Sequence, residues 1–196
     1  FEFIMLYFLF SFIHSRILLS DVLIRIPTYV KEEGSYPYHF VTCFSPDCTF
    51  KSNDTDLIEL DIVERNSTIT LVKIISKCPI PADTQVIATS GKESVKITVH
   101  IDNIYYLKIL TTSGYLCVNC LGPIKLVAYN KDFLTFSSIK GTIIEWGPDI
   151  PDRPFDFIDP QNSKIKLDYD YDITNIIQPT KNATINITCR LVYRKE

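Results

Sequence analysis

The stretch Ser94-Val95-Lys96-Ile97-Thr98-Val99-His100-Ile101 alternates polar and apolar residues without a break. Successive side chains of a β-strand point to opposite faces, so this pattern places the apolar residues on one face and the polar residues on the other. Residues 164–173 alternate in the same way over ten positions. Both segments are therefore predicted to be half-buried strands.

Shorter runs rich in β-branched and aromatic residues fill most of the remaining chain. They are residues 22–30, 39–43, 56–62, 68–75, 84–89, 105–110, 124–129, 133–137, 142–146 and 183–191. Turn signals such as Ser90-Gly91 and Gly122-Pro123 separate them. We find no long apolar stripe at helical spacing and no internal sequence repeat. Strands of this length and spacing predict an all-β protein, an antiparallel β-sandwich of the immunoglobulin-like kind.

Length and composition bound the number of domains. The chain has 196 residues, of which 46% are hydrophobic and 22% charged, enough for one large domain or two small ones. We expect residues 21–196 to form one β-sandwich domain. Residues 147–163 hold four prolines and five aspartates or arginines, which predicts a long irregular loop or a linker. The strands after this loop are too few to form a domain alone, so they should return to the preceding sandwich.

The N-terminus resembles a secretory signal. Residues 3–13 are eleven residues with one serine and no charge, typical of the apolar region of a signal peptide and too short to span a bilayer. Residues 1–20 are therefore predicted to be a signal peptide, with cleavage after Ser15 or Ser20 because both put a small residue at the cut. The alternative is a buried strand or helix at the start of the domain.

Four Asn-x-Ser/Thr triplets agree with a secretory route. They begin at Asn53, Asn66, Asn182 and Asn186 and are predicted to be glycosylation sites. In residues 183–191 the odd positions are apolar and the even ones polar, so a strand there would turn Asn186 outward and Cys189 inward. Asn66 shares parity with Thr70 and should face outward with it.

Six cysteines form an even set: Cys43, Cys48, Cys78, Cys117, Cys120 and Cys189. Behind a signal peptide, an even set predicts three disulfides, for which fifteen pairings are open. The close spacing of Cys43 with Cys48 and of Cys117 with Cys120 would also fit a zinc site, but a secretory route disfavours it. A redox role for Cys117 and Cys120 is disfavoured as well, because no helix N-terminus is predicted beside them to stabilise a thiolate. No metal and no cofactor are expected.

Catalytic signals are weak. After residue 20 the chain has two histidines, His39 and His100, and no Gly-x-Ser-x-Gly motif, so no enzymatic activity is predicted. A secreted hydrolase is the alternative, which a histidine beside a serine and a carboxylate would favour. The acidic run from Asp168 to Asp172 resembles the start of a calcium loop, but Ile173 stands where the loop needs glycine.

Several short motifs resemble a known family. The segment Val41-Thr42-Cys43-Phe44-Ser45-Pro46, the step Cys78-Pro79 and a last cysteine in a terminal strand are similar to the 6-Cys (s48/45) surface proteins of apicomplexan parasites. The resemblance implies a β-sandwich and a role at the cell surface. It also implies disulfides that join Cys43 to Cys48, Cys78 to Cys189 and Cys117 to Cys120.

These features predict a secreted or cell-surface disulfide-bonded glycoprotein that acts by binding a host or surface protein, as an antigen or in adhesion. The alternative is a secreted immune-modulating decoy that binds a host cytokine or receptor. The net charge of −3 gives no electrostatic basis for binding nucleic acid. Attachment to a membrane is expected only through a segment outside these residues, and the expected location is the extracellular side of the plasma membrane or the medium.

Overall fold

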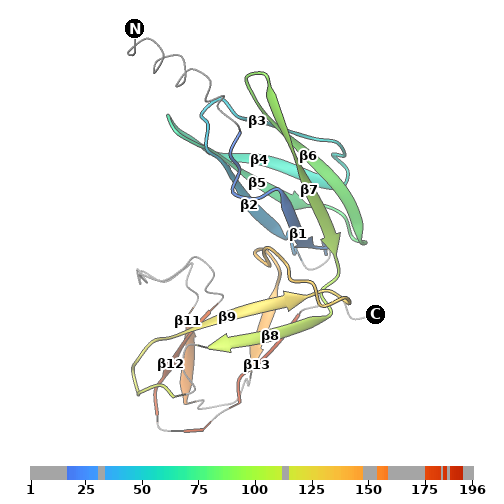
Figure 1. The fold of residues 1–196 in the computed structure, drawn as a ribbon. Coiled ribbons are helices and arrows are strands. Elements are labelled where there is room, and N and C mark those ends of the chain that lie inside the picture. Colours follow the sequence, from blue (N-terminus) through green and yellow to red (C-terminus); the bar gives the residue numbers. More distant parts are fainter. Residues whose placement is uncertain are drawn as a thin grey trace, which may run out of the picture. The chain divides into compact units, whose positions relative to one another are not determined.

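The computed structural model describes residues 17–30, 34–111, 115–147, 154–158, 175–181, 183–184 and 186–191. All regular secondary structure in these residues is β-strand, which confirms the all-β prediction (Figure 1). The chain divides into two compact units. Unit 1 contains Phe1–Tyr29, Tyr36–Asp102 and Ser137–Gly141, and unit 2 contains Val30–Ser35, Asn103–Phe136 and Thr142–Glu196. The expected extent of the sandwich domain, residues 21–196, stays a prediction.

Unit 1 is a sandwich of two sheets. One sheet has the order β1-β7-β6-β3 and the other the order β2-β5-β4. Their strands are β1 (Leu23–Pro27), β2 (Tyr38–Cys43), β3 (Thr49–Ser52), β4 (Ile58–Arg65), β5 (Thr70–Ser76), β6 (Ala82–Ser90) and β7 (Glu93–Asp102). Neighbours are antiparallel except for β1, which pairs parallel to β7. Before β1, Leu19 pairs antiparallel with Cys43 of β2, so the first part of the chain contributes to both sheets.

Strands β2 to β7 follow the order of strands B to G in an immunoglobulin constant-type sandwich, whereas β1 lies beside β7 and not beside β2. The core lies between the sheets, where alternate residues are buried. On β7 these are Ile97, Val99 and Ile101, as the alternation predicts. Burying a side chain of this size contributes about 1.5 to 3 kcal/mol.

One predicted orientation in unit 1 is wrong. Thr70 is fully buried, whereas its parity with Asn66 predicts an outward side chain. Its hydroxyl donates to the carbonyl oxygens of Ser45 and Pro46 at 3.0 and 3.1 Å, so this buried hydroxyl has hydrogen-bond partners in the protein interior. The parity fails because residues 66–69 form the turn between β4 and β5, where strand alternation does not apply.

Unit 2 also has two sheets. Their orders are β11-β12-β9-β8 and β10-β13. The strands are β8 (Tyr106–Thr111), β9 (Gly122–Tyr129), β10 (Ile144–Gly147), β11 (Phe155–Ile158), β12 (Asn175–Pro179) and β13 (Thr188–Leu191). By order and pairing, β9 to β13 repeat the positions that β2 to β6 hold in unit 1, although no sequence repeat accompanies them. Its core cluster in the described residues is Ile124, Phe155 and Ile177.

Two other predictions change in unit 2, and a third cannot be compared. Residues 147–163 are predicted to be an irregular loop, yet β11 lies inside them, because Phe155 is a buried core residue and the segment pairs with β12. Residues 133–137 are predicted to be a strand, but Phe133 has a φ of 59°, which an extended strand does not allow. Only Thr135 there forms an isolated bridge, to Tyr129. The predicted strand at 164–173 lies outside the described residues.

Alternation in the last predicted strand is confirmed where the structure describes it. Cys189 and Leu191 of β13 are half-buried, whereas Thr188 and Arg190 are exposed. The regular strand covers four residues of the nine predicted for 183–191.

Gly141 generates a testable prediction about unit 1. The N–H groups of Tyr36 and Tyr38 donate to the carbonyls of Gly141 and Lys140 at 3.1 and 3.0 Å, which holds residues 137–141 against the start of β2. Gly141 has a φ of +80°, and an added Cβ would collide with the carbonyl oxygen of Tyr36. Gly141→Ala should therefore lower the urea midpoint of unfolding.

Gly91 supplies the matched control, because it has a φ of +61° and nothing within 4 Å of an added Cβ. Gly91→Ala should lower the free energy of unfolding only by the strain of a left-handed backbone, about 1 to 2 kcal/mol. Equal midpoint shifts for the two variants would show that the collision between the added Cβ and the Tyr36 carbonyl adds nothing to the loss of stability in Gly141→Ala.

Candidate interaction surface

The outer face of the β2-β5-β4 sheet carries an aromatic group. On β2, Val41 and Cys43 are buried, so Tyr38 and Phe40 lie on the opposite face. On β5, Lys73 and Ile75 alternate with buried residues in the same way. The register pairs Tyr38 with Ile75 and Phe40 with Lys73, which makes these four side chains direct cross-strand neighbours.

Contacts between these side chains order the face. The Nζ atom of Lys73 lies 4.2 Å from the centre of the Tyr38 ring, and Tyr38 meets Phe40 edge-on with ring centres 5.3 Å apart. Lys140 lies over Phe40, with its Nζ atom 5.5 Å from the ring centre. Each cation–π contact contributes about 0.5 to 1 kcal/mol at an exposed site. The aromatic rings are therefore held in place before any partner binds.

A shallow hollow of about 460 Å³ lies on this face. It is lined by Tyr29, Tyr36, Glu59, Lys73, Ile75 and Lys77. The rings of Tyr29 and Tyr36 are 5.1 Å apart at 46°, and Tyr36 is 52% exposed. We call Tyr29, Tyr36, Tyr38, Phe40, Lys73 and Ile75 the aromatic face. The hollow on this face combines the tyrosine rings with the positive groups of Lys73 and Lys77 and the negative group of Glu59. It can therefore accept both apolar and charged side chains.

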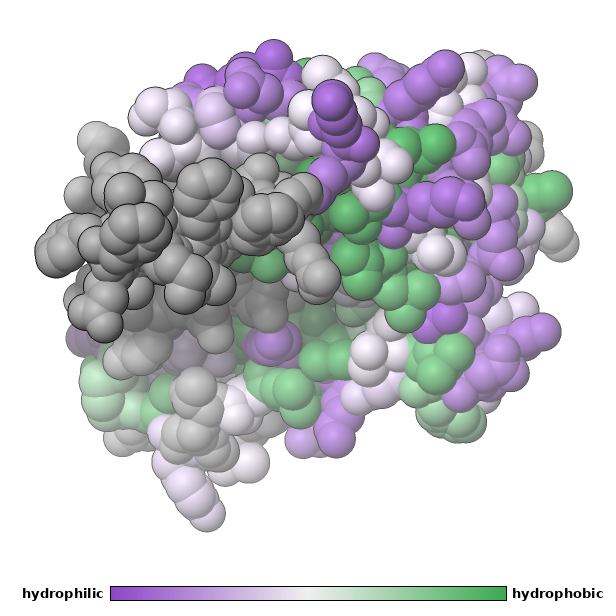
Figure 2. Space-filling view, turned by 45° about the horizontal axis from the view of Figure 1, so that its top comes forward, coloured by the Kyte–Doolittle hydropathy of each residue, from purple (hydrophilic) through white to green (hydrophobic). Residues whose placement is uncertain are grey.

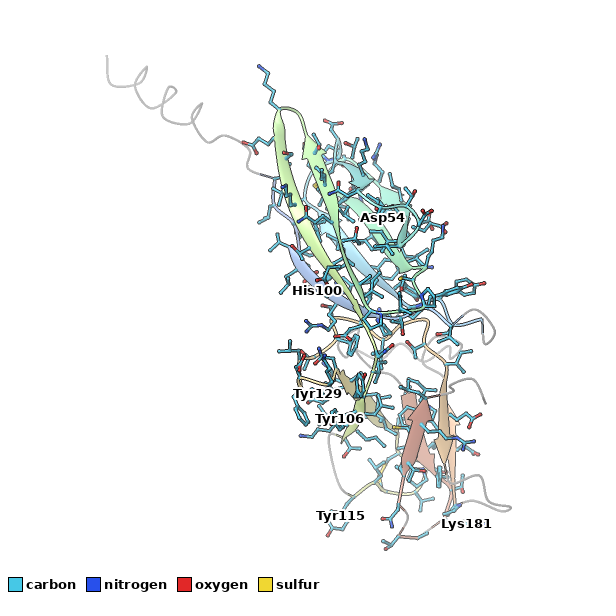
Figure 3. All side chains as sticks on the ribbon, turned by 90° about the vertical axis from the view of Figure 1, so that its right-hand side faces the viewer. Asp54, His100, Tyr106, Tyr115, Tyr129 and Lys181 are labelled. Carbon is cyan, nitrogen blue, oxygen red and sulfur yellow. A yellow bond between two sulfur atoms is a disulfide. The ribbon has the colours of Figure 1, made fainter. Side chains whose placement is uncertain are left out.

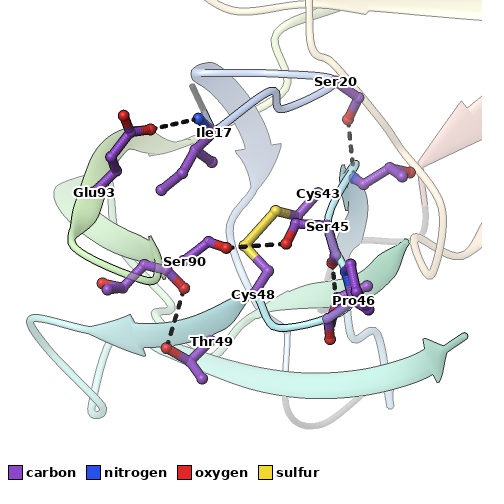
Figure 4. Close-up of a disulfide and its surroundings, with 12 residues drawn as sticks. Ile17, Ser20, Cys43, Ser45, Pro46, Cys48, Thr49, Ser90 and Glu93 are labelled. Atoms are coloured by element: carbon purple, nitrogen blue, oxygen red, sulfur yellow. Dashed lines mark hydrogen bonds between the residues drawn. A yellow bond between two sulfur atoms is a disulfide. The ribbon is translucent and has the colours of Figure 1, made fainter. Parts of the chain in front are cut away.

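A disulfide braces the loop after β2 (Figure 4). Cys43 and Cys48 are bonded, and the Ser45 hydroxyl lies 2.9 Å from that of Ser90, the last residue of β6. The Nη2 atom of Arg65 donates to the Cys48 carbonyl at 2.8 Å. These contacts fix the loop that carries Phe44, which is 54% exposed.

The remaining cysteines behave differently. Cys117 is bonded to Cys120 in unit 2. Cys78 and Cys189 are free thiols, one in each unit, so the third predicted disulfide is not formed. Cys78 is buried, and partial burial raises the pKa of the Cys189 thiol by desolvation. The number of cysteines does not show whether the protein forms two disulfides or three, because pairing depends on the unit in which each cysteine lies.

The histidines in the described part of the chain, His39 and His100, each contact a carboxylate. The Nε2 atom of His39 lies 3.2 Å from Asp21, and the Ser20 hydroxyl donates to the same carboxylate oxygen at 2.9 Å. The carboxylate thus stands between serine and histidine, whereas nucleophilic catalysis needs the histidine beside the hydroxyl. His100, labelled in Figure 3, lies 2.6 Å from Asp83. Neither histidine has the arrangement that would favour a hydrolase.

Three of the four predicted glycosylation sites can be placed. Asn53, Asn66 and Asn186 are exposed, and Asn182 lies outside the described residues. The side-chain oxygen of Asn66 accepts hydrogen bonds from the N–H and hydroxyl of Thr68, at 2.9 Å each. The described residues contain no group of three or more His, Cys, Asp or Glu side chains arranged to hold a metal ion.

Exposed apolar residues also occur outside the aromatic face. On the face drawn in Figure 2, groups of hydrophobic residues lie between hydrophilic ones. In unit 2, Tyr106 stacks on Phe133 with ring centres 4.7 Å apart, and Tyr115 is 93% exposed; Figure 3 labels both tyrosines. Within the described ranges, no helix is long and apolar enough to cross a membrane.

Comparison with known proteins gives structural likeness only. No protein-family model matches the chain, and no curated protein matches its sequence. Domains 5–6 of the S-layer protein SbsC have a TM-score of 0.43 and 14% identity, covering 90% of each chain. The chain spans 29% of the structure of SbsC domains 4–9. The adhesin InvE of Yersinia pseudotuberculosis has a TM-score of 0.29 and 13% identity over 84% of this chain and 51% of that one.

The aromatic face was not predicted from the sequence. The predicted strand begins at His39, which leaves Tyr36 and Tyr38 in the preceding turn region. The signal was the alternation Tyr36-x-Tyr38-x-Phe40, which continues the outward parity of β2.

The cysteine states give the second prediction. Alkylation of the unreduced protein unfolded in urea should label Cys78 and Cys189 and no other cysteine. In the folded protein Cys189 should react before Cys78, because Cys78 is 5% exposed. The raised pKa of Cys189 leaves less thiolate at a given pH, so its alkylation should be slower than that of glutathione and should accelerate at a higher pH. A peptide that links Cys78 to Cys189 would contradict this prediction.

Proposed function

We propose that this protein is an extracellular disulfide-bonded glycoprotein that binds another protein through the aromatic face of unit 1. The aromatic face is the observation that carries the proposal. Outward sheet positions usually hold polar residues, yet here Tyr38 and Phe40 meet edge-on and the Lys73 ammonium lies over the Tyr38 ring. Tyr36, just before the strand, lines the same hollow as Lys73. Tyrosine and phenylalanine are enriched at protein interfaces, and rigid aromatic anchors lose little entropy on binding.

Three features support an extracellular location. Cys43–Cys48 and Cys117–Cys120 are disulfides, which persist in oxidising compartments. Asn53, Asn66 and Asn186 are exposed, where a glycan can be attached without entering the core. Residues 3–13 have the apolar pattern of a secretory signal.

The geometry supports binding over hydrolysis. The hollow on the aromatic face is lined by neither histidine, and Asp21 separates Ser20 from His39. In this hollow Lys73, Lys77 and Glu59 lie beside the tyrosine rings. This arrangement suits a protein partner that presents both apolar and charged side chains. The same face would serve a protein displayed at the cell surface or a decoy released into the medium.

The binding prediction compares matched pairs of variants. Tyr36→Ala and Lys73→Glu should weaken binding of labelled protein to partner-bearing cells by about tenfold or more, the scale of an interface hot spot. Tyr115→Ala and Lys96→Glu are the controls, since exposed Tyr115 belongs to unit 2 and exposed Lys96 belongs to the other sheet of unit 1. Flow cytometry gives the apparent affinity. Equal binding by all four variants would contradict the proposed face.

The secretion prediction concerns the mature N-terminus. Ile17 and Leu19 pack against the core of unit 1, and the N–H of Ser20 donates to the Thr42 carbonyl at 2.9 Å. A cut after Ser20 would remove these contacts, whereas a cut after Ser15 keeps them. Mass spectrometry of the secreted protein should therefore find Arg16 as its first residue. A first residue of Asp21 would show that residues 17–20 are dispensable for the fold.

A further inference from the structure

The two disulfides differ in how far a thiol from solution can reach them. Cys43 and Cys48 are 0% exposed and belong to the core cluster of unit 1. In unit 2, Cys117 is exposed and its partner Cys120 is half-buried. A thiolate cleaves a disulfide by direct attack on one of the two sulfur atoms, so the rate depends on access to that atom. Among the bonded cysteines, Cys117 is therefore the one that a thiol reaches most easily.

The Cys117–Cys120 bond closes a turn that is hydrogen-bonded to β12. The N–H of Cys120 donates to the Cys117 carbonyl at 3.0 Å, and Asn119 between them has a φ of 65°. The N–H of Asn119 donates to the Pro179 carbonyl at 2.8 Å, and the Gln178 side chain donates to the Asn119 carbonyl at 3.3 Å. Pro179 and Gln178 belong to β12. The disulfide thus holds the residue that attaches this turn to the sheet.

We propose that the Cys117–Cys120 disulfide is a reversible exchange site for low-molecular-weight thiols, attacked at Cys117, and that its opening loosens the turn from β12. The attacking thiolate forms a new S–S bond with the Sγ atom of Cys117. The original bond breaks, its electron pair leaves with the Sγ atom of Cys120, and that thiolate takes up a proton from water. The product is a mixed disulfide on Cys117 beside a free Cys120 thiol.

The reverse reaction uses the same atoms. Cys120 lies three residues from Cys117, so its thiolate can attack the mixed disulfide, release the small thiol and restore the original bond. While the bond is open, Asn119 is no longer held in the left-handed region, which is unfavourable for a residue with a side chain. The backbone can then leave this conformation, and its hydrogen bonds to β12 weaken.

This role differs from that of a disulfide oxidoreductase. An oxidoreductase needs a cysteine thiolate that is stabilised for attack, and the sequence disfavours such a role for this pair. A disulfide that receives the attack needs access instead, and exposed disulfides are in general the labile ones. The exchange site belongs to unit 2, so it does not depend on the proposed role of the aromatic face in unit 1.

Differential alkylation of the whole folded chain tests the site. A light maleimide first blocks the accessible free thiols, and reduced glutathione is then added. After an acid quench, an isotopically heavy maleimide labels each new thiol, and mass spectrometry maps the peptides. Glutathione should be found on Cys117 and the heavy label on Cys120. Glutathione attached to Cys120 instead would overturn the proposal.

The Cys43–Cys48 bond is the matched control in the same molecule. It should open about tenfold more slowly, or slower still, than the Cys117–Cys120 bond, because both of its cysteines are buried. In urea this ratio should fall, since unfolding exposes both bonds. Equal rates in the folded protein would contradict the proposal. An unchanged ratio in urea would assign the difference to the size of the disulfide ring and would contradict it as well.

Hydrogen exchange measures what the bond holds in place. The double variant Cys117→Ser with Cys120→Ser should speed exchange of the Asn119 amide, because the ring no longer keeps this amide on the Pro179 carbonyl. The hydrogen-bonded amide of Thr98 in unit 1 is the control, and its exchange should not change. If the Asn119 amide exchanges at the same rate with and without the disulfide, the bond does not hold the turn on β12 and that part of the proposal is wrong.

Discussion

The register between β6 and β7 is the constraint on which unit 1 depends. Ala82 stands opposite Ile101 and Ser90 opposite Glu93, with every residue between them paired. A slip by one residue would move Ile97 and Val99 from the core to solvent, because side chains alternate with a period of two. β1 is added to one side of this pair and β3 to the other, so the whole sheet takes its alignment from it.

The same parity positions the aromatic face on the other sheet. Cys43 must face inward to join the core, and this requires Tyr38 and Phe40 to face outward on β2. The Cys43–Cys48 bond and the buried Thr70 hydroxyl then fix the loop at the end of that strand. The outward orientation of these half-buried rings is therefore a consequence of how β2 is anchored, and it is set before a partner binds.

The sequence predicts the long strands well and the short ones poorly. Residues 94–101 and 84–89 carry enough alternation to locate β7 and β6, because each residue's environment repeats with the pleat. β3 and β12 are four and five residues long, and their pairing comes from tertiary contacts that no local pattern records. The aromatic face was missed for a related reason, since Tyr36 precedes the regular strand and is held by a carbonyl from residue 141.

Side-chain hydrogen bonds explain where alternation misleads. Residues 133–137 are rich in strand formers, yet the buried Asn130 side chain accepts hydrogen bonds from the N–H groups of Asp132 and Leu134 at 3.0 and 2.9 Å. These bonds replace the partners that a strand would supply and turn the backbone. The turn places Phe133 in the left-handed region, at a cost of about 1 to 2 kcal/mol, and stacks its ring on Tyr106. One buried amide therefore outweighs the strand preference of five residues, because its hydrogen bonds are local and the strand would have had to find a distant partner.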